Sequence, residues 1–204
     1  MTKGEASGPI LPHGGYRALK SYQMAEIVYD ATVAFCQRFV PWRSRTRDQM
    51  VQAARSGKQN IAEASVVSGT SRKSEMKLVG VARASLEELL QDYEDFLRQR
   101  GFRLWGRDHP QARAVRALAY VPNRSYSTYR TYVERANAEV AANTLICLIH
   151  QANYLLDRQL RRLEEQFVAE GGFTERLYRH RVASRRVAAR HPRGERRHSP
   201  GGAP

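Results

Sequence analysis

Apolar residues recur every three to four positions along four long segments of the chain, and no other feature constrains its fold so strongly. Residues at this spacing lie on one face of an α-helix, so each segment predicts a helix with one apolar stripe. These helices are expected at about residues 16–39, 46–64, 71–100 and 127–168. Because no segment alternates as a β-strand does, the sequence predicts an all-α fold, namely an antiparallel four-helix bundle with a long fourth helix.

Several residues mark where these helices begin and end. Pro41 stops the first helix, because the residue before a proline disfavours helical backbone. Thr46–Gln49 matches a capping box, which predicts the start of the second helix. Ser71 or Ser74 is expected to cap the third helix, and Gly101 to end it.

Small residues dominate the expected inner face of the second helix. This face consists of Met50, Ala53, Ala54, Gly57, Ile61 and Ala64. Gly57 costs about 1 kcal/mol of helix propensity, and close approach of a neighbouring helix is the expected compensation. The second helix is therefore placed inside the bundle.

Two further helical features follow the third helix. Asp108-His109-Pro110 predicts the start of a short helix over Ala112–Tyr120, with Asp108 as its cap. The fourth long helix spans about 60 Å at 1.5 Å per residue, more than a compact bundle needs. Its C-terminal half is therefore expected to pack on a second subunit or on Phe173–Tyr178.

Positive charge is spread unevenly along the 204 residues, whose net charge is +14. Nine arginines and two glutamates lie within residues 174–204, so this segment carries half of the net charge. We expect a disordered leader over 1–15, a bundle over 16–173 and a basic tail over 174–204 that is disordered beyond Val187. Within the bundle, residues 16–121 form the first helices and residues 122–173 the long fourth helix.

The two cysteines and the hydropathy indicate the cellular compartment of the protein. Cys36 and Cys147 each lie in an apolar helical pattern, which is typical of buried free thiols and fits a reducing cytoplasm. No run of about 18 apolar residues is present, so no membrane partner is expected.

Sequence signals for catalysis are absent. The histidines lack zinc-ligand spacing, and no glycine-rich phosphate loop occurs. Glu134 and Glu139 lack the Glu-x-x-His pattern of di-iron bundles. We therefore expect a non-enzymatic protein without a metal or another cofactor.

Two segments of the second and third helices resemble a known family. They are Asp48–Ser56 (DQMVQAARS) leading into Asn60–Ala64 (NIAEA), and Ala82–Leu89 (ARASLEEL). Together they resemble the bacterial four-helix bundle family. That family includes proteins encoded in intervening sequences of the large-subunit ribosomal RNA gene, and the accessory protein of diversity-generating retroelements. Ala142–Asp157 with Gly171–Tyr178 resembles the branch that has a C-terminal suffix region.

This resemblance implies a ring-like homopentamer with a basic surface. In the retroelement branch it also implies binding to nucleic acid and to a reverse transcriptase. The chain departs from the family pattern at three positions, with Ala64 and Ala84 where glycine is common and Lys58 where proline is frequent. The last change implies a straighter second helix.

Basic residues near two helix starts are the first candidate site. Cations there oppose the helix dipole, whereas a phosphate backbone would explain them. The candidates are Arg43, Arg45, Arg47, Arg55, Lys58, Arg72, Lys73 and Lys77. Ordinary solvated charge, with Asp48 and Glu75 as local partners, is the alternative.

The tail and a tyrosine cluster are two more candidates. Arginine-rich segments bind RNA or DNA without sequence preference, although a tail of this kind can also serve only solubility. The tail candidates are Arg176, Arg179, Arg181, Arg185 and Arg186. Aromatic rings beside arginines favour base stacking, and four tyrosines are interleaved with Arg124 and Arg130: Tyr120, Tyr126, Tyr129 and Tyr132. The three-residue spacing of the last three favours packing or a subunit interface instead.

Four polar residues lie in the family-like segments. Asn60, Glu63, Arg83 and Ser85 are expected to form a buried structural network, with Glu63 and Arg83 paired between the second and third helices. No nucleophile–base set accompanies them, which disfavours catalysis.

These observations favour a non-enzymatic, oligomeric nucleic-acid-binding bundle. The resemblance implies, more specifically, an accessory protein of a retroelement reverse transcriptase. The alternative is a structural or protein-interaction scaffold without a direct nucleic-acid role. A nuclease is the weakest hypothesis, because no Asp/Glu/His cluster is apparent.

Overall fold

The computed structural model describes residues 13–190, and only the backbone of the last four of these. This part of the chain is helical and contains no strand, which confirms the all-α prediction. The elements are η1 (Tyr16–Ala18), α1 (Lys20–Phe39), α2 (Arg45–Val67), α3 (Arg72–Gln99), α4 (Pro110–Ala117), η2 (Leu118–Tyr120), α5 (Tyr126–Arg130), η3 (Thr131–Arg135), α6 (Ala138–Glu170) and α7 (Phe173–Arg190).

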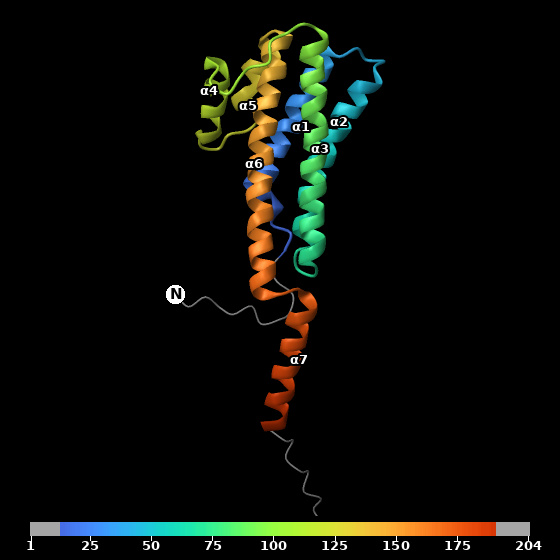
Figure 1. The fold of residues 1–204 in the computed structure, drawn as a ribbon, viewed down its shortest axis with the longest axis vertical. Helices are drawn as coiled ribbons and strands as arrows, with labels where there is room; N and C mark the ends of the chain where they lie inside the picture. Colours follow the sequence, from blue (N-terminus) through green and yellow to red (C-terminus); the bar gives the residue numbers. More distant parts are fainter. Residues whose placement is uncertain (1–12, 191–204) are drawn as a thin grey trace, which may run out of the picture.

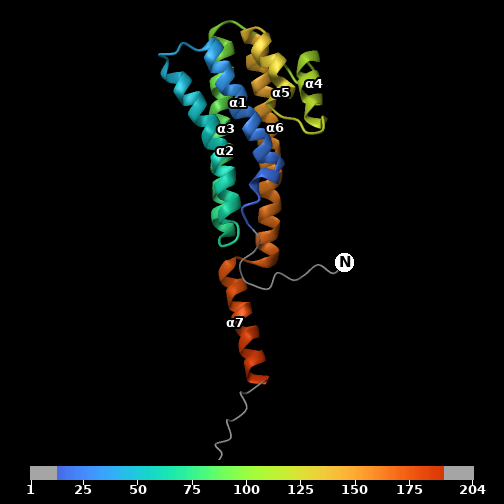
Figure 2. The same ribbon diagram turned by 180° about the vertical axis from the view of Figure 1, so that it is seen from behind.

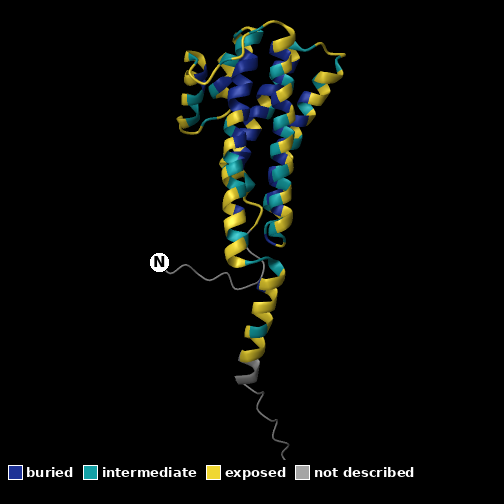
Figure 3. Ribbon diagram, in the orientation of Figure 1, coloured by how far each residue is buried: buried dark blue, intermediate teal, exposed yellow. Residues whose placement is uncertain are grey.

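Four long helices lie side by side and run alternately up and down (Figure 1). Contacts join α1 to α2, α2 to α3, α3 to α6, and α6 back to α1, so each of them packs on two others. Buried residues gather on the faces that these helices turn toward one another (Figure 3). The short α4 packs on α6 and the short α5 on α1, and α7 extends away from the far end of α6 (Figure 2).

The closest approach in the core is between α2 and α3. All six residues predicted for the inner face of α2 are buried. A Cβ atom placed on Gly57 would lie 2.7 Å from Cδ2 of Leu86, a fully buried residue of α3. The absence of a side chain at Gly57 therefore allows α3 to pack directly on α2, as the small-residue stripe predicts.

The helix starts agree with the sequence in part. Ser71 caps α3, since its hydroxyl accepts a hydrogen bond from the backbone N–H of Ser74, and Gly101 follows α3 with φ of +65°. The predicted capping box at Thr46 is wrong, because α2 already begins at Arg45 behind Ser44. Asp108 is also not a cap, because His109 takes that position before α4.

The predicted continuous fourth helix is wrong. α5 passes into a π-helical turn, η3, and the chain leaves helical geometry at Ala136 before α6 begins. Asn137 starts the new helix, since its Oδ1 accepts a hydrogen bond from the backbone N–H of Val140 at 2.9 Å. At the break, the Arg38 guanidinium donates to the carbonyl oxygens of Val133 and Ala136, at 2.5 and 3.2 Å. Arg38 therefore stabilises the backbone before the break, and Asn137 stabilises the backbone after it.

The disorder predicted beyond Val187 is wrong for residues 188–190, because the helix α7 spans Phe173–Arg190. Residues 191–204 of the tail and 1–12 of the leader lie outside the described residues. Gly14, in the predicted leader, donates its backbone N–H to the carbonyl oxygen of Ser65 at 2.9 Å.

Candidate nucleic-acid interface

The predicted basic residues at the starts of α2 and α3 lie at opposite ends of the molecule, because these two helices run antiparallel (Figure 1). The 23 residues of α2 separate them by about 35 Å. Arg43, Arg45 and Arg47 are therefore not part of one surface with Arg72, Lys73 and Lys77.

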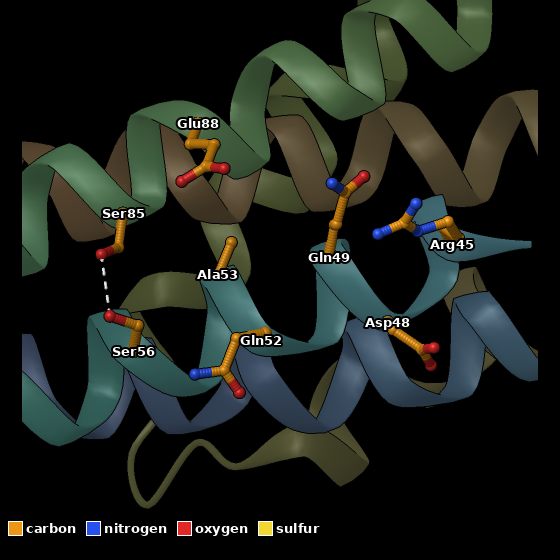
Figure 4. A pocket seen from close by; sticks show the side chains of 8 residues that line it. All are labelled: Arg45, Asp48, Gln49, Gln52, Ala53, Ser56, Ser85 and Glu88. Atoms are coloured by element: carbon orange, nitrogen blue, oxygen red, sulfur yellow. Dashed lines mark hydrogen bonds between the residues drawn. The ribbon is translucent and has the colours of Figure 1, made fainter.

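The α2 start offers little free positive charge. The Arg43 guanidinium lies over the exposed ring of Trp42, 4.5 Å from its centroid. Arg45 lines a pocket of about 500 Å³ between α2 and α3, together with the carboxylates of Asp48 and Glu88 (Figure 4). Two carboxylates more than offset one arginine there, so this pocket does not favour phosphate.

The Arg47 side chain is half-buried and makes no hydrogen bond or ion pair within residues 13–186. The other predicted cations divide into engaged and free side chains. Lys58 lies over the Tyr29 ring, with its Nζ 4.5 Å from the centroid, and Arg72 pairs with the buried carboxylate of Glu75 at 2.9 Å. Three others are exposed and make no hydrogen bond or ion pair within the described part of the chain. These are Arg55, Lys73 and Lys77.

The predicted polar network is in fact two separate groups. Ser85 shares a hydrogen bond with Ser56 at 3.0 Å, and Asn60 donates to the Ser56 hydroxyl at 3.1 Å, which joins α2 to α3 (Figure 4). Arg83 does not pair with Glu63, which is exposed. The partner of Arg83 is Asp157 of α6.

This second group links α3 to α6. Arg83 Nε lies 2.6 Å from Asp157 Oδ1, and Arg83 Nη1 lies 3.8 Å from Glu87 Oε2. Glu87 in turn accepts a hydrogen bond from the amide of Asn153 at 3.1 Å. Both groups are structural, since each connects neighbouring helices.

Sequence reasoning missed the basic residues at the C-terminal end of α6. Arg158, Arg161 and Arg162 are exposed, and with Lys20 at the start of α1 they line a groove of about 610 Å³. Glu165 is the one carboxylate among its lining residues. The i, i+3, i+4 spacing of the three arginines was the available signal, because it places them on one helical face.

Basic residues lie in the C-terminal half of α6, in the first two turns of α3, and along α7, which projects away from the bundle. α7 begins where α6 ends, and the first turn of α3 lies beside them in both views (Figures 1 and 2). Of the predicted tail residues, Arg176 is buried and the other four are exposed. We call the exposed set the basic end: Lys73, Lys77, Arg161, Arg162, Arg179, Arg181, Arg185 and Arg186.

The described residues offer no obvious reactive centre. No group of His, Cys, Asp or Glu side chains within residues 13–186 is arranged to hold a metal ion. Burial raises the pKa of the Cys36 thiol to about 12 and also raises the pKa of the Cys147 thiol. Both cysteines are free, as predicted, and their thiols are protonated near neutral pH, which is the unreactive form.

Searches of protein families, curated proteins and solved structures found no match to this chain. The resemblance to the bacterial four-helix bundle family therefore stays a hypothesis that depends on the segments quoted above. In the described part of the chain, no helix has the length and apolar character needed to cross a bilayer.

Proposed function

We propose that this chain is a four-helix bundle that binds nucleic acid, and that the basic end is its main contact with the phosphate backbone. One observation carries the proposal: exposed cations lie in the first two turns of α3, in the C-terminal half of α6, and along α7, which projects from that end of the bundle. The closed cycle of contacts among α1, α2, α3 and α6 supports the bundle.

The physical basis is electrostatic. Exposed lysines and arginines without carboxylate partners neutralise phosphates and release the counterions condensed on the nucleic acid. Each neutralised phosphate adds about 0.9 to the slope of log affinity against log salt for duplex DNA, and about 0.7 for a single strand. This mode of binding needs no catalytic group and reads no sequence.

Charge reversal within the full chain tests the proposal. Replacing both Arg161 and Arg162 by Glu should weaken binding of a labelled RNA in fluorescence anisotropy and reduce the salt slope by about 1.4. The matched control replaces Arg55 and Arg135, two exposed arginines outside the basic end, by Glu. Equal losses in both variants would show that only the net charge matters, and would overturn the assignment of the basic end.

A scaffold is the second candidate, because apolar side chains are exposed near the junction of α6 and α7. Val168, Leu177 and Tyr178 are 80%, 37% and 68% exposed. Exposed apolar side chains of this kind favour a protein partner. The resemblance implies two such partners, namely further copies of this chain and a reverse transcriptase. Light scattering distinguishes these versions, since self-association requires a mass above that of one chain at micromolar concentration.

A further inference from the structure

A second basic surface adjoins the groove of α6 described above, with which it shares Lys20, Leu155 and Arg158, and lies between α4 and α6. It is a groove of about 830 Å³, which we call the α4–α6 groove. One wall is α6, and the other consists of α4 and the loops on either side of it. Ligands bind most often in the largest well-formed concavity of a protein.

The wall opposite α6 is held in place by hydrogen bonds. Buried Asn143 accepts the Trp105 backbone N–H on its Oδ1 at 2.8 Å and donates to the carbonyl oxygen of Arg103 at 2.9 Å. The Arg116 guanidinium donates to the carbonyl oxygen of Arg107 at 2.5 Å. The groove is therefore preformed by the fold.

Its lining is strongly positive. Five cations face one carboxylate, that of Glu94; the cations are Lys20, Arg107, Arg116, Arg124 and Arg158. A concave surface with one sign of charge concentrates counter-ions, so the groove favours an anionic occupant.

Aromatic rings accompany this charge. Tyr120 is 90% exposed and Tyr154 is 59% exposed, so neither side chain is held by the core. The Arg158 guanidinium lies over the Tyr154 ring, 5.9 Å from its centroid. Exposed rings beside arginines in a basic channel are the combination on which unpaired bases stack.

An unsatisfied amide completes the site. Gln151 lines the groove, and both polar atoms of its amide are buried without a hydrogen-bond partner within residues 13–186. Leaving such a group unpaired is costly. Because both atoms are closed to solvent, the side chain must turn into the groove before its donors and acceptor can hydrogen-bond a base edge.

From this combination we propose that the α4–α6 groove binds an unpaired stretch of single-stranded nucleic acid. Its bases stack on Tyr120 and Tyr154, and its phosphates contact the surrounding arginines. Duplex is excluded from the stacking contact because its bases are already paired and stacked. The inference rests on the proposed function, but it concerns the groove and not the basic end.

The test uses the full chain and three labelled probes of equal length: oligo-U, oligo-dT and a mixed-sequence duplex. Tyr154→Leu keeps apolar bulk and removes the aromatic face, whereas Tyr154→Phe keeps that face. We expect Tyr154→Leu to weaken binding of both single strands about tenfold, with an unchanged salt slope and unchanged duplex binding. Tyr154→Phe should bind as the wild type does. Trp42→Leu, which removes an exposed ring outside the groove, is the matched control.

A second readout reports on the groove directly. The chain has two tryptophans, so Trp42→Phe leaves Trp105, which lines the groove, as the one emitter. Oligo-U and oligo-dT should change its fluorescence, and the duplex should not.

The outcomes separate this inference from the proposed function. If Tyr154→Leu weakens binding of duplex and single strand equally, or weakens neither, the groove is not a single-strand site, although the basic end can still bind nucleic acid. If the wild type binds none of the three probes, the proposed function itself fails.

Discussion

Arg83 of α3 and Asp157 of α6 form an ion pair with a distance of 2.6 Å between Nε and Oδ1. The two residues are 74 positions apart in the sequence, and their pair fastens α3 to α6. Both side chains are about 40% exposed, so solvent screens much of the attraction.

A double-mutant cycle measures this pair. We expect Arg83→Ala, Asp157→Ala and the double variant to give a coupling free energy of about 0.5–1 kcal/mol in urea unfolding. A cycle of Arg83 with Glu63, the partner that the sequence suggested, should give no coupling. The reverse ranking would contradict the assignment of Asp157 as the partner.

Gly57 provides a test of the α2–α3 contact. A Cβ atom at this position meets Cδ2 and Cγ of Leu86 at 2.7 and 2.8 Å. Gly57→Ala gains up to about 1 kcal/mol of helix propensity but overpacks a buried contact, so its free energy of unfolding should fall by about 1–2 kcal/mol.

Gly80 is the matched control for that substitution, since its added Cβ would meet nothing within 4 Å. Gly80→Ala in α3 should therefore stabilise the protein by up to about 1 kcal/mol. If Gly57→Ala stabilises the protein as much as Gly80→Ala does, the two helices are not in close contact at Gly57.

Much of the packing between α2 and α3 could be predicted from the sequence. The stripe on α2 and the compensation expected for Gly57 followed from periodicity and side-chain size alone, because both are local properties of one helix. Buried Tyr129 likewise confirms the packing interpretation for that member of the tyrosine cluster.

Other features depend on contacts distant in sequence. The break before α6 was missed because its signal combines the cap of Asn137 with Arg38, which lies 95 residues before Val133. Tyr120 and Arg124, which line the α4–α6 groove, were base-stacking candidates in the sequence. The groove itself was missed, since Lys20, Trp105 and Arg158 come together only after the chain has folded. In the same way, Glu63 was a reasonable partner for Arg83 by charge, but it lies on an exposed face.

Asn143 should control the wall of the α4–α6 groove. Its side chain satisfies the backbone at Trp105, Arg103 and Glu139. Asn143→Ala leaves the part-buried backbone groups of Trp105 and Arg103 without this partner, so we expect the free energy of unfolding to fall by about 1–3 kcal/mol. Trp105 emission should shift to longer wavelength as the loop loosens. An unchanged stability and spectrum would show that the loop does not depend on Asn143.

Asp92 gives a pH-dependent prediction. Burial, followed by the nearby carboxylates of Glu88 and Asp95, raises the pKa of Asp92. Because the folded state holds this proton more tightly, the stability that Asp92 contributes is full below its unfolded pKa of about 3.9 and is lost as pH rises through the folded pKa.

Asp92→Asn cannot ionise, so this variant does not lose that stability as the pH rises. Its free energy of unfolding should exceed that of the wild type at about pH 7, and the difference should disappear near pH 3, where both states are protonated. Urea unfolding at the two pH values measures this difference. Glu164→Gln, at an exposed position of α6, serves as the control. A gain of the same size at both pH values would mean that ionisation of Asp92 is not its cause.

The most direct test of nucleic-acid binding is a salt titration of the wild-type chain. Fluorescence anisotropy with labelled RNA, single-stranded DNA and duplex DNA compares the dissociation constants at about 50 and 200 mM salt. If about six residues of the basic end neutralise phosphates, affinity should fall by about a thousandfold across this range. No detectable binding at the lower salt concentration, or an affinity that does not change with salt, would contradict the account.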